Sequence, residues 1–497
     1  MKQNKNNNLI SVFNSIYKKK LRIKNFKNIK MNIFINNKFK FKKKIYKIIF
    51  MIIKLIYIFI IIIFVKSYLL NFNNNKNSYN YIKNNNKRIQ EKKILKIKFA
   101  IYIPTLFNGG RERITSLLLN YLSKEQNFDL YLFSKNNKNE NEYKIPDVIN
   151  RIVVLGFEDL KNKLINNNID VFVYQFYNLR EIEILNELTN FKTIFYNHSM
   201  FLFWIYFNKT DFLKSFYGTY KKSKFIISLI PFENDFLFKK WGINSILMNN
   251  FITYDYEQII PSNLTSKIII MIGRGSDPLK RFDLGIKAMK YIVEEIPDIE
   301  MKIISDLNGI EYLVNLTKEL NLTNNIKFEG YTFKPEIYYS NASLHIFPTE
   351  IECFPTVLSE TKVFGIPNIL VGIDYVSQAE GGVININDDN PITISRESIK
   401  ILKNETYRKQ LGRDARKSMK KFSNRLTLKK WIDLIFAVNK GEYYYNELKK
   451  KDKEISKMKA INQLKNQLKF IKKRIPTMNN ISLNDLYNLS FIDKLKM

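Results

Sequence analysis

A repeated alternation between short apolar runs and amphipathic helical segments, from about residue 94 onward, most constrains the fold of this chain. Seven apolar runs come first, and five more follow after the polar stretch 259–266. Such alternation predicts parallel sheets with helices on both faces. Because the pattern restarts, we predict two α/β domains, at residues 94–255 and 256–439. The expected strands are 97–103, 130–133, 152–155, 171–174, 193–196, 225–229, 245–248, 268–272, 301–304, 326–328, 344–347 and 368–371. The clearest expected helices are 113–122, 180–188, 283–295, 310–320, 359–364 and 406–422.

The net charge of +35 raises the hypothesis that the chain binds nucleic acid. However, residues 1–98 contribute +24 and residues 440–497 contribute +8, so the expected folded body between them carries only +3. A nucleic-acid enzyme more often carries its basic stripe on the folded domains. We therefore expect no nucleic-acid partner.

An apolar run at residues 48–65, with Lys54 as its single charge, is long enough for a membrane helix. Lys54 lies near one end of the run, where a long side chain reaches the membrane interface. A signal peptide and a buried core helix are the alternatives. A signal peptide would have small residues at a cleavage site, and a buried core helix would show a polar face. This segment has neither feature. We predict a basic tail at 1–47, a transmembrane anchor at 48–70 and a stem at 71–93.

Charge on the two flanks of this run predicts its orientation. Seven lysines lie in residues 28–47 and three in residues 66–85, which favours a cytosolic amino end. The folded body of a single-pass membrane protein would then face a lumen, of the ER or Golgi if the source is eukaryotic. After the body, residues 440–497 form a basic tail. Apolar residues recur there every three or four positions, which predicts an amphipathic helix packed on the body or on a partner.

Potential metal ligands are scarce. The chain contains one cysteine, Cys353, and two histidines, His198 and His345. A single cysteine excludes an intrachain disulfide, and a Cys/His zinc site needs more of these ligands close together. No Asp-x-Asp pair follows an expected strand convincingly, so neither a metal nor another cofactor is predicted.

A glycine-containing loop follows the first expected strand of each domain. In the first domain, Gly109 and Gly110 precede a helix start, where close backbone approach and free N–H groups suit an anion. A plain strand–helix loop is the alternative there. In the second domain the loop contains Gly273, Arg274 and Lys280. A planar guanidinium and an ammonium at a strand end suit a diphosphate, with surface ion pairs as the alternative.

The most informative segment is 347–367, which follows an expected strand and then opens a helix. It contains Glu352 and Glu360 with the spacing Glu-x7-Glu. Backbone N–H groups at the helix start could bind a phosphate, and Glu360 could reach a ribose diol; either glutamate could instead be a solvated charge. The residues expected at this helix start are Phe354, Pro355, Thr356 and Val357.

Together these motifs resemble the family 4 retaining glycosyltransferases, of the two-domain GT-B architecture. The resemblance extends from about residue 97 to residue 431. It rests on the glycine motif 109–112, the loop 273–280, the paired glutamates and the stretch 359–367 that follows them. Asn250 is similar to the Asn at that family's domain junction. We therefore expect two Rossmann-like domains facing across a cleft, with an N-terminal transmembrane helix.

The resemblance also implies an activity. It implies a nucleotide-diphosphate-sugar donor, UDP- or GDP-linked, a glycan or lipid-linked acceptor, and transfer with retention. Arg274 and Lys280 would neutralise the leaving diphosphate, Glu352 would contact the donor sugar, and Glu360 would hold the ribose. His198 stands where the family often has a His near the sugar, and a structural role is its alternative. Fixed cations and helix-start N–H groups can stabilise a leaving diphosphate without a metal.

Two residues depart from the family pattern. Arg111 stands where a small residue is common, and Arg281 stands where the family often has Gly; either could narrow the cleft or contact a phosphate. Donor hydrolysis, epimerisation and a non-catalytic GT-B scaffold are the alternative functions. A scaffold would predict loss of Arg274, Lys280 or a motif glutamate, and all of them are present.

Overall fold

The computed structural model describes residues 96–107, 109–175, 187, 191–200, 217, 225–243 and 245–441. The predicted basic tail, membrane anchor and stem lie outside these residues, as do the predicted helix 180–188 apart from residue 187 and the carboxyl-terminal tail from residue 442. Within the described part of the chain, none of the helices has the length and apolar character needed to cross a membrane. Residues 95–497 belong to one compact unit.

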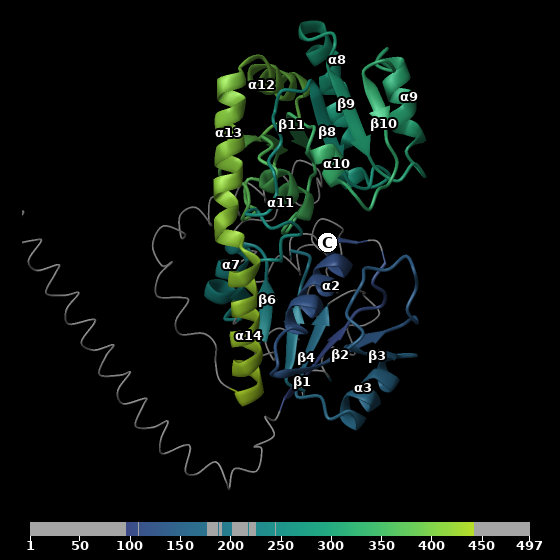
Figure 1. The fold of residues 1–497 in the computed structure, drawn as a ribbon, viewed down its shortest axis with the longest axis vertical. Coiled ribbons are helices and arrows are strands. Elements are labelled where there is room, and N and C mark those ends of the chain that lie inside the picture. Colours follow the sequence, from purple (N-terminus) through teal and green to yellow (C-terminus); the bar gives the residue numbers. More distant parts are fainter. Residues whose placement is uncertain are drawn as a thin grey trace, which may run out of the picture. The chain divides into compact units, whose positions relative to one another are not determined.

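The first domain is built on a seven-stranded sheet in the order β3-β2-β1-β4-β5-β6-β7 (Figure 1). Neighbouring strands are parallel throughout, and all seven predicted runs are confirmed as strands. Their Ile, Val and Phe side chains suit a sheet that helices cover on both faces. The strands are β1 (Ile97–Tyr102), β2 (Phe128–Ser134), β3 (Asn150–Val153), β4 (Val171–Gln175), β5 (Thr193–Tyr196), β6 (Phe225–Ser228) and β7 (Ser245–Leu247). The helices are α2 (Gly110–Leu122), α3 (Phe157–Asn166) and α7 (Pro231–Trp241).

The second domain repeats this arrangement with a six-stranded parallel sheet, in the order β10-β9-β8-β11-β12-β13. Five of its strands are confirmed as predicted, and β13 is an addition. The strands are β8 (Ile268–Ile272), β9 (Glu300–Ile304), β10 (Ile326–Phe328), β11 (Leu344–Phe347), β12 (Asn368–Val371) and β13 (Val383–Ile386). The helices are η2 (Pro278–Lys280), α8 (Phe282–Glu295), α9 (Glu311–Glu319), α10 (Glu336–Tyr339), α11 (Thr356–Val363), α12 (Pro391–Lys403), α13 (Glu405–Ser418) and η3 (Met419–Phe422).

Both sheets reverse their strand order next to their first strand. The reversal lies between β1 and β4 in the first sheet and between β8 and β11 in the second. In open parallel sheets, ligands bind beyond the carboxyl ends of the strands at such a reversal. The loops that follow these four strands are therefore the places to look for a site.

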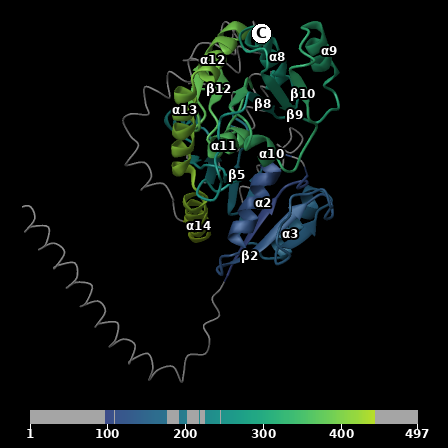
Figure 2. The same ribbon diagram turned by 45° about the horizontal axis from the view of Figure 1, so that its top comes forward.

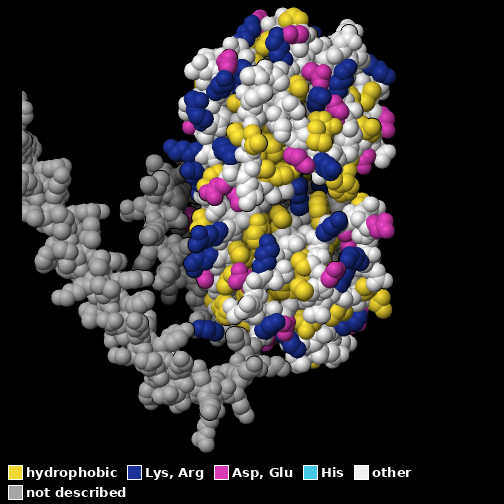
Figure 3. Space-filling model, in the orientation of Figure 1, with side chains coloured by type: hydrophobic (Ala, Val, Ile, Leu, Met, Phe, Trp, Pro, Cys, Tyr) yellow, Lys and Arg dark blue, Asp and Glu magenta, His cyan; other side chains and the backbone are white. Residues whose placement is uncertain are grey.

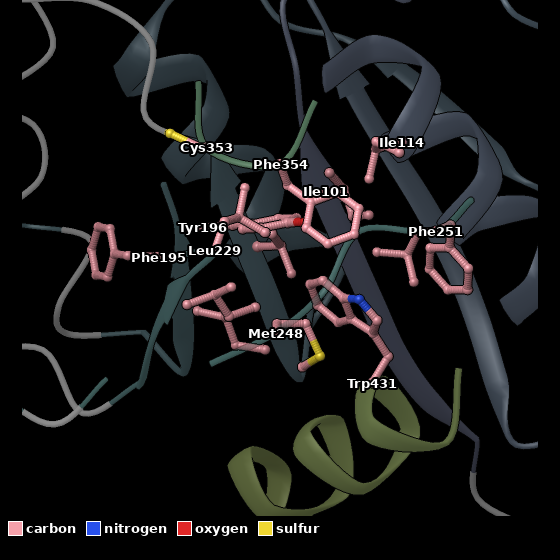
Figure 4. Packing of buried hydrophobic residues seen from close by; sticks show 14 of the residues in the cluster. Ile101, Ile114, Phe195, Tyr196, Leu229, Met248, Phe251, Cys353, Phe354 and Trp431 are labelled. Carbon is pink, nitrogen blue, oxygen red and sulfur yellow. The ribbon is translucent and has the colours of Figure 1, made fainter. Parts of the chain in front are cut away.

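The last described helix, α14 (Asn424–Lys440), returns from the second domain to the first, against α2 and β4 (Figures 1 and 2). Its Trp431 is fully buried, and the indole meets the Tyr196 ring edge-on with 5.4 Å between centroids (Figure 4). The same core contains Phe347 and Phe354 from the second domain. One continuous apolar core thus joins the two sheets through side chains of both domains.

Backbone contact without intervening side chains fixes α13 beside the end of α11. A Cβ added at Gly412 would lie 2.4 Å from the carbonyl oxygen of Gly365, which has a φ of +72°. We expect Gly412→Ala to lower the free energy of unfolding by about 1–3 kcal/mol, because the helices would have to separate. Gly156→Ala is the control, since nothing lies within 4 Å of its added Cβ. Urea denaturation of the full chain measures both, and equal stabilities would contradict this packing.

Candidate active site

An ion pair joins the two loops at the strand reversal of the second sheet. Lys280, at the end of η2 in the loop after β8, places Nζ 2.5 Å from Oε1 of Glu352, in the loop after β11. The two side chains are 19% and 16% exposed, so the pair is largely buried but reachable. Thr349 Oγ1 donates to the same carboxylate oxygen at 3.3 Å. The Glu352 backbone N–H donates to the Tyr375 hydroxyl at 3.0 Å, which fixes the loop.

The loop after β8 also contains a cation, Arg274, whose side chain is largely exposed. Gly273 lies under the Lys280 side chain, since a Cβ added there would lie 3.9 Å from Lys280 Cδ. The Gly275 backbone N–H donates to Ser305 Oγ at 2.7 Å and ties the loop to the next strand's end. By contrast, the Arg274 side chain is 74% exposed, and its guanidinium pairs with the Asp277 carboxylate at 3.3 Å. Arg274 can therefore turn toward a bound anion at small cost.

Arg281 has a structural role, which resolves one departure from the family pattern. Its φ of +50° is a conformation that glycine adopts readily, which fits the Gly that the resemblance implies at this position. Its guanidinium is buried and donates to the carbonyl oxygen of Pro348 at 2.6 Å and to Asp389 at 2.5 Å. These bonds brace the loop after β11 and leave the phosphate-contact interpretation of Arg281 without support.

The start of α2 in the first domain faces the start of α11 in the second. A Cβ added at Gly110 would lie 4.0 Å from Oγ1 of Thr356, the first residue of α11. Neither Gly109 nor Pro355, the residues preceding these helices, caps its helix with a side chain. Two helix starts that lack a side-chain cap, each with the positive end of its dipole, therefore lie close together at the domain boundary, which favours an anion there.

The predicted helix-start residues differ in what they contact. Phe354 is buried in the main core, with its ring edge-on to Phe422 at 5.5 Å. Val357 packs against a small cluster of the second domain, and Thr356 stays partly exposed at the boundary. Of these side chains, Thr356 is the one placed to meet a ligand, while Phe354 and Val357 position the backbone.

Glu360 is enclosed by protein groups. Its carboxylate is 2% exposed and accepts from Arg113 Nη1 at 2.9 Å, Thr253 Oγ1 at 2.7 Å and the Tyr339 hydroxyl at 2.6 Å. Sequence reasoning missed Arg113 as a site residue. The signal was available, because Arg113 lies three positions after Gly110 on α2 and so occupies the same helix face.

His198 is held at the carboxyl end of the first sheet. Its Nε2 lies 2.7 Å from Oε1 of Gln175, whose Nε2 donates to Thr115 Oγ1 at 2.7 Å. Burial lowers the pKa of His198 well below its usual value, and the nearby charge of Arg111 lowers it further. The imidazole is therefore neutral at pH 7. It can exchange a hydrogen bond with a ligand but carries no charge.

Asn250 lies at the domain junction, as the resemblance implies. It is buried, and its Oδ1 accepts a hydrogen bond from the Tyr196 hydroxyl. Tyr196 also packs its ring 4.0 Å from the His198 ring, centroid to centroid. Asn250 thus holds the Tyr196 ring in place beside His198.

The other histidine, His345 in β11, gives the protein a dependence of stability on pH. It is fully buried, its Nδ1 lies 2.7 Å from Asn368 Oδ1, and burial lowers its pKa to about 4. Between pH 6.5 and 4 the unfolded chain therefore binds more protons than the folded one, and stability falls as pH falls. We expect urea denaturation to show this loss from pH 7 to 5, and His345→Leu to reduce the slope. An unchanged slope would mean that other groups cause the loss.

The described residues contain no group of three or more His, Cys, Asp or Glu side chains able to hold a metal ion. What they do bring together at the domain boundary is three cation–carboxylate pairs and two helix starts. The pairs are Lys280–Glu352, Arg113–Glu360 and Arg111–Glu112, the last at 2.5 Å. Fixed cations of this kind, near uncapped helix starts, can neutralise a polyanionic group and the charge it gains in a reaction.

Comparison with known sequences finds similarity mainly in the second domain. Residues 254–418 match the family Glycosyl transferases group 1. An uncharacterized glycosyltransferase of Haemophilus influenzae is 27% identical over 146 residues, which are 29% of this chain and 40% of that protein. The chain spans about half or less of the length of the curated relatives it matches.

Solved structures show the fold. Sucrose-phosphate synthase from Thermosynechococcus elongatus superimposes with a TM-score of 0.58 at 14% identity, covering 70% of this chain and 100% of that one. Anabaena HepE, solved in complex with UDP and glucose, superimposes with a TM-score of 0.54 at 10% identity, covering 69% of this chain and 100% of that one. The described residues therefore have a GT-B fold with two parallel sheets.

Proposed function

We propose that this protein is a glycosyltransferase that transfers a sugar from a UDP- or GDP-sugar to a glycan or lipid-linked acceptor, without a metal and with retention. The observation that carries the proposal is the Lys280–Glu352 pair, which joins the two loops at the strand reversal. One of these loops also contains the exposed Arg274, and the other leads into α11. The family match of residues 254–418, the similarity to a glycosyltransferase of Haemophilus influenzae and the shared fold of a structure solved with UDP and glucose support the same class.

The chemistry requires one bond to break and one to form. The bond between the anomeric carbon and the diphosphate oxygen breaks, and its electron pair leaves with the diphosphate. Lys280 and Arg274 would bind that developing charge, together with N–H groups at the start of α11. The acceptor hydroxyl oxygen forms the new bond and gives up its proton. With retention, the hydroxyl attacks from the side of the leaving diphosphate, whose oxygen would take the proton.

The remaining site residues would orient the donor. Glu352, held by Lys280 and Thr349, would bind sugar hydroxyls, and neutral His198 would do so from the first domain. The glycines at 109 and 110 would let the α2 backbone approach the donor closely. We further propose that the apolar segment 48–70 anchors the chain in a membrane as a single pass, which would suit a lipid-linked acceptor.

A donor screen tests the activity. The full chain is incubated with UDP- and GDP-sugars in the presence of EDTA, with thermal shift and donor consumption as readouts. We expect one donor to raise the melting temperature and to be consumed only when an acceptor is added. Consumption without an acceptor would indicate hydrolysis instead. If no nucleotide binds, the site is a relic of the fold and the non-catalytic scaffold alternative holds.

Figure 3 shows cations and anions both spread over the visible face of the two domains, in keeping with the charge of +3 carried by residues 99–439. We propose on this ground that nucleic acid is not a partner. Loss of glycosyl transfer on adding nucleic acid at physiological salt would contradict it.

A further inference from the structure

One ion pair at the domain boundary joins residues from different domains. Arg113 lies in the first turn of α2, and Glu360 lies in the second turn of α11, 247 positions later. Nη1 of Arg113 lies 2.9 Å from Oε1 of Glu360. By contrast, Lys280–Glu352 lies within the second domain and Arg111–Glu112 within the first. Of these three pairs, Arg113–Glu360 is therefore the one that resists separation of the two domains.

Glu360 has no room for a ligand in this arrangement. Both of its carboxylate oxygens accept hydrogen bonds from protein groups, and the residue is 2% exposed. If Glu360 binds the hydroxyls of a ribose, as the proposed function has it, at least one of its present donors must leave first.

The three donors differ in how easily they can leave. Tyr339 is fully buried in the second domain, against the rings of Tyr254 and Phe364. Thr253 lies on the connection between the domains and has a short side chain. Arg113 comes from the other domain, its side chain is 23% exposed, and its long stem can swing aside. Arg113 is the donor that can leave without disturbing a core.

We propose that Arg113 is an interdomain latch: it closes the empty site by binding Glu360, and the ribose of an incoming nucleoside diphosphate displaces it. This inference rests on the proposed function. Hydroxyls of the ribose would replace the guanidinium as hydrogen-bond donors to the Glu360 carboxylate. The released Arg113 would remain at the start of α2, beside the site. Donor binding would thereby be coupled to the contact between the domains through a single carboxylate.

In this proposal the ribose of the nucleotide competes with the Arg113 guanidinium for the Glu360 carboxylate. When only a fraction of molecules is competent to bind, the apparent dissociation constant rises by the inverse of that fraction. If the latch is closed in about nine molecules of ten, its removal tightens nucleotide binding about tenfold. If Arg113 instead held the Glu360 carboxylate in position for the ribose, removing Arg113 would weaken nucleotide binding, since the ribose would lose a correctly placed hydrogen-bond acceptor.

Isothermal titration calorimetry of the full chain with UDP and GDP tests the proposal. We expect Arg113→Ala to bind one of these nucleotides about tenfold more tightly than the wild type, while pyrophosphate, which has no ribose, binds equally to both. Arg113→Gln, which keeps a neutral donor, should fall between them and guards against misfolding of the Ala variant. Lys124→Ala, which removes an exposed cation just beyond the other end of α2, is the control and should not change the affinity.

A double-mutant cycle with Glu360→Gln separates the latch from a direct contact. Arg113 acts through Glu360, so Arg113→Ala should no longer tighten binding in the Glu360→Gln background. Unchanged or weaker nucleotide binding by Arg113→Ala overturns the latch while leaving the glycosyltransferase proposal intact. If neither the wild type nor any of these variants binds a nucleotide, the proposed function fails and the latch fails with it.

Discussion

We expect Lys280→Ala to lower the turnover of the proposed sugar transfer by about 10²–10³-fold, the loss typical for one electrostatic group that stabilises a developing charge. Lys280 lies in the loop after β8 at the strand reversal, and its side chain is 19% exposed beside Glu352. Because the diphosphate gains charge as the glycosidic bond breaks, this loss should appear in kcat and not only in KM. Steady-state kinetics with the donor found by the screen measure it.

Glu352→Gln should cause a loss of similar size, and the double variant should lose less than the product of the two. The reason is that Lys280 Nζ and Glu352 Oε1 are 2.5 Å apart, so each group sets the position and charge of the other. Lys287→Ala is the control, because it removes an exposed lysine of α8 that pairs with Asp283. Wild-type turnover in Lys280→Ala would place the active site elsewhere.

Most of the sheet architecture could be predicted from the sequence. Runs such as Ile268–Ile272 consist of residues with high strand propensity and are bounded by polar loops, so their position is a local property. A strand that is apolar on both faces can bury both of them only inside a sheet that is covered on both sides. That local signal is why the described strands of both domains, apart from β13, were found.

The elements that were missed lack such a local signal. Strand β13 is a half-buried edge strand whose Asn385 interrupts the apolar run. Helix α12 mixes isoleucines with two lysines, two serines and one threonine, and these polar residues obscure its apolar side in the sequence. Helix α14 resembles any amphipathic helix in sequence. That it buries Trp431 under the first sheet depends on contacts with residues far away in the chain.

The contacts of the candidate site also fall into two groups: those that local sequence predicts and those that depend on how the domains pack. That the loops containing Gly273, Lys280 and Glu352 lie together could be predicted, because these loops follow strands of one parallel sheet; that they form an active site stays a prediction. The bond between Arg113 and Glu360 could not, because nothing local relates two side chains 247 positions apart. Their meeting depends on how the domains pack, and packing is decided by the shared core, in which Trp431 is one of the largest side chains.

Trp431→Ala should lower the free energy of unfolding by about 3–5 kcal/mol, the usual cost of truncating a buried aromatic side chain. Figure 4 shows the indole rising from α14 between Met248 and Phe251, beneath Ile101 of β1. The cavity would open where α14, a helix of the second half of the chain, holds the first sheet. Urea denaturation of the full chain measures the loss.

Two companion variants identify the cause. Within the described part of the chain the indole Nε1 has no hydrogen-bond partner, so Trp431→Phe removes only packing and should cost clearly less than Trp431→Ala. Leu426→Ala, on the half-exposed face of the same helix, should change stability by less than about 1 kcal/mol. If Trp431→Ala were no worse than Leu426→Ala, α14 would not anchor the first domain. The domain contact that carries Arg113 to Glu360 would then need another support.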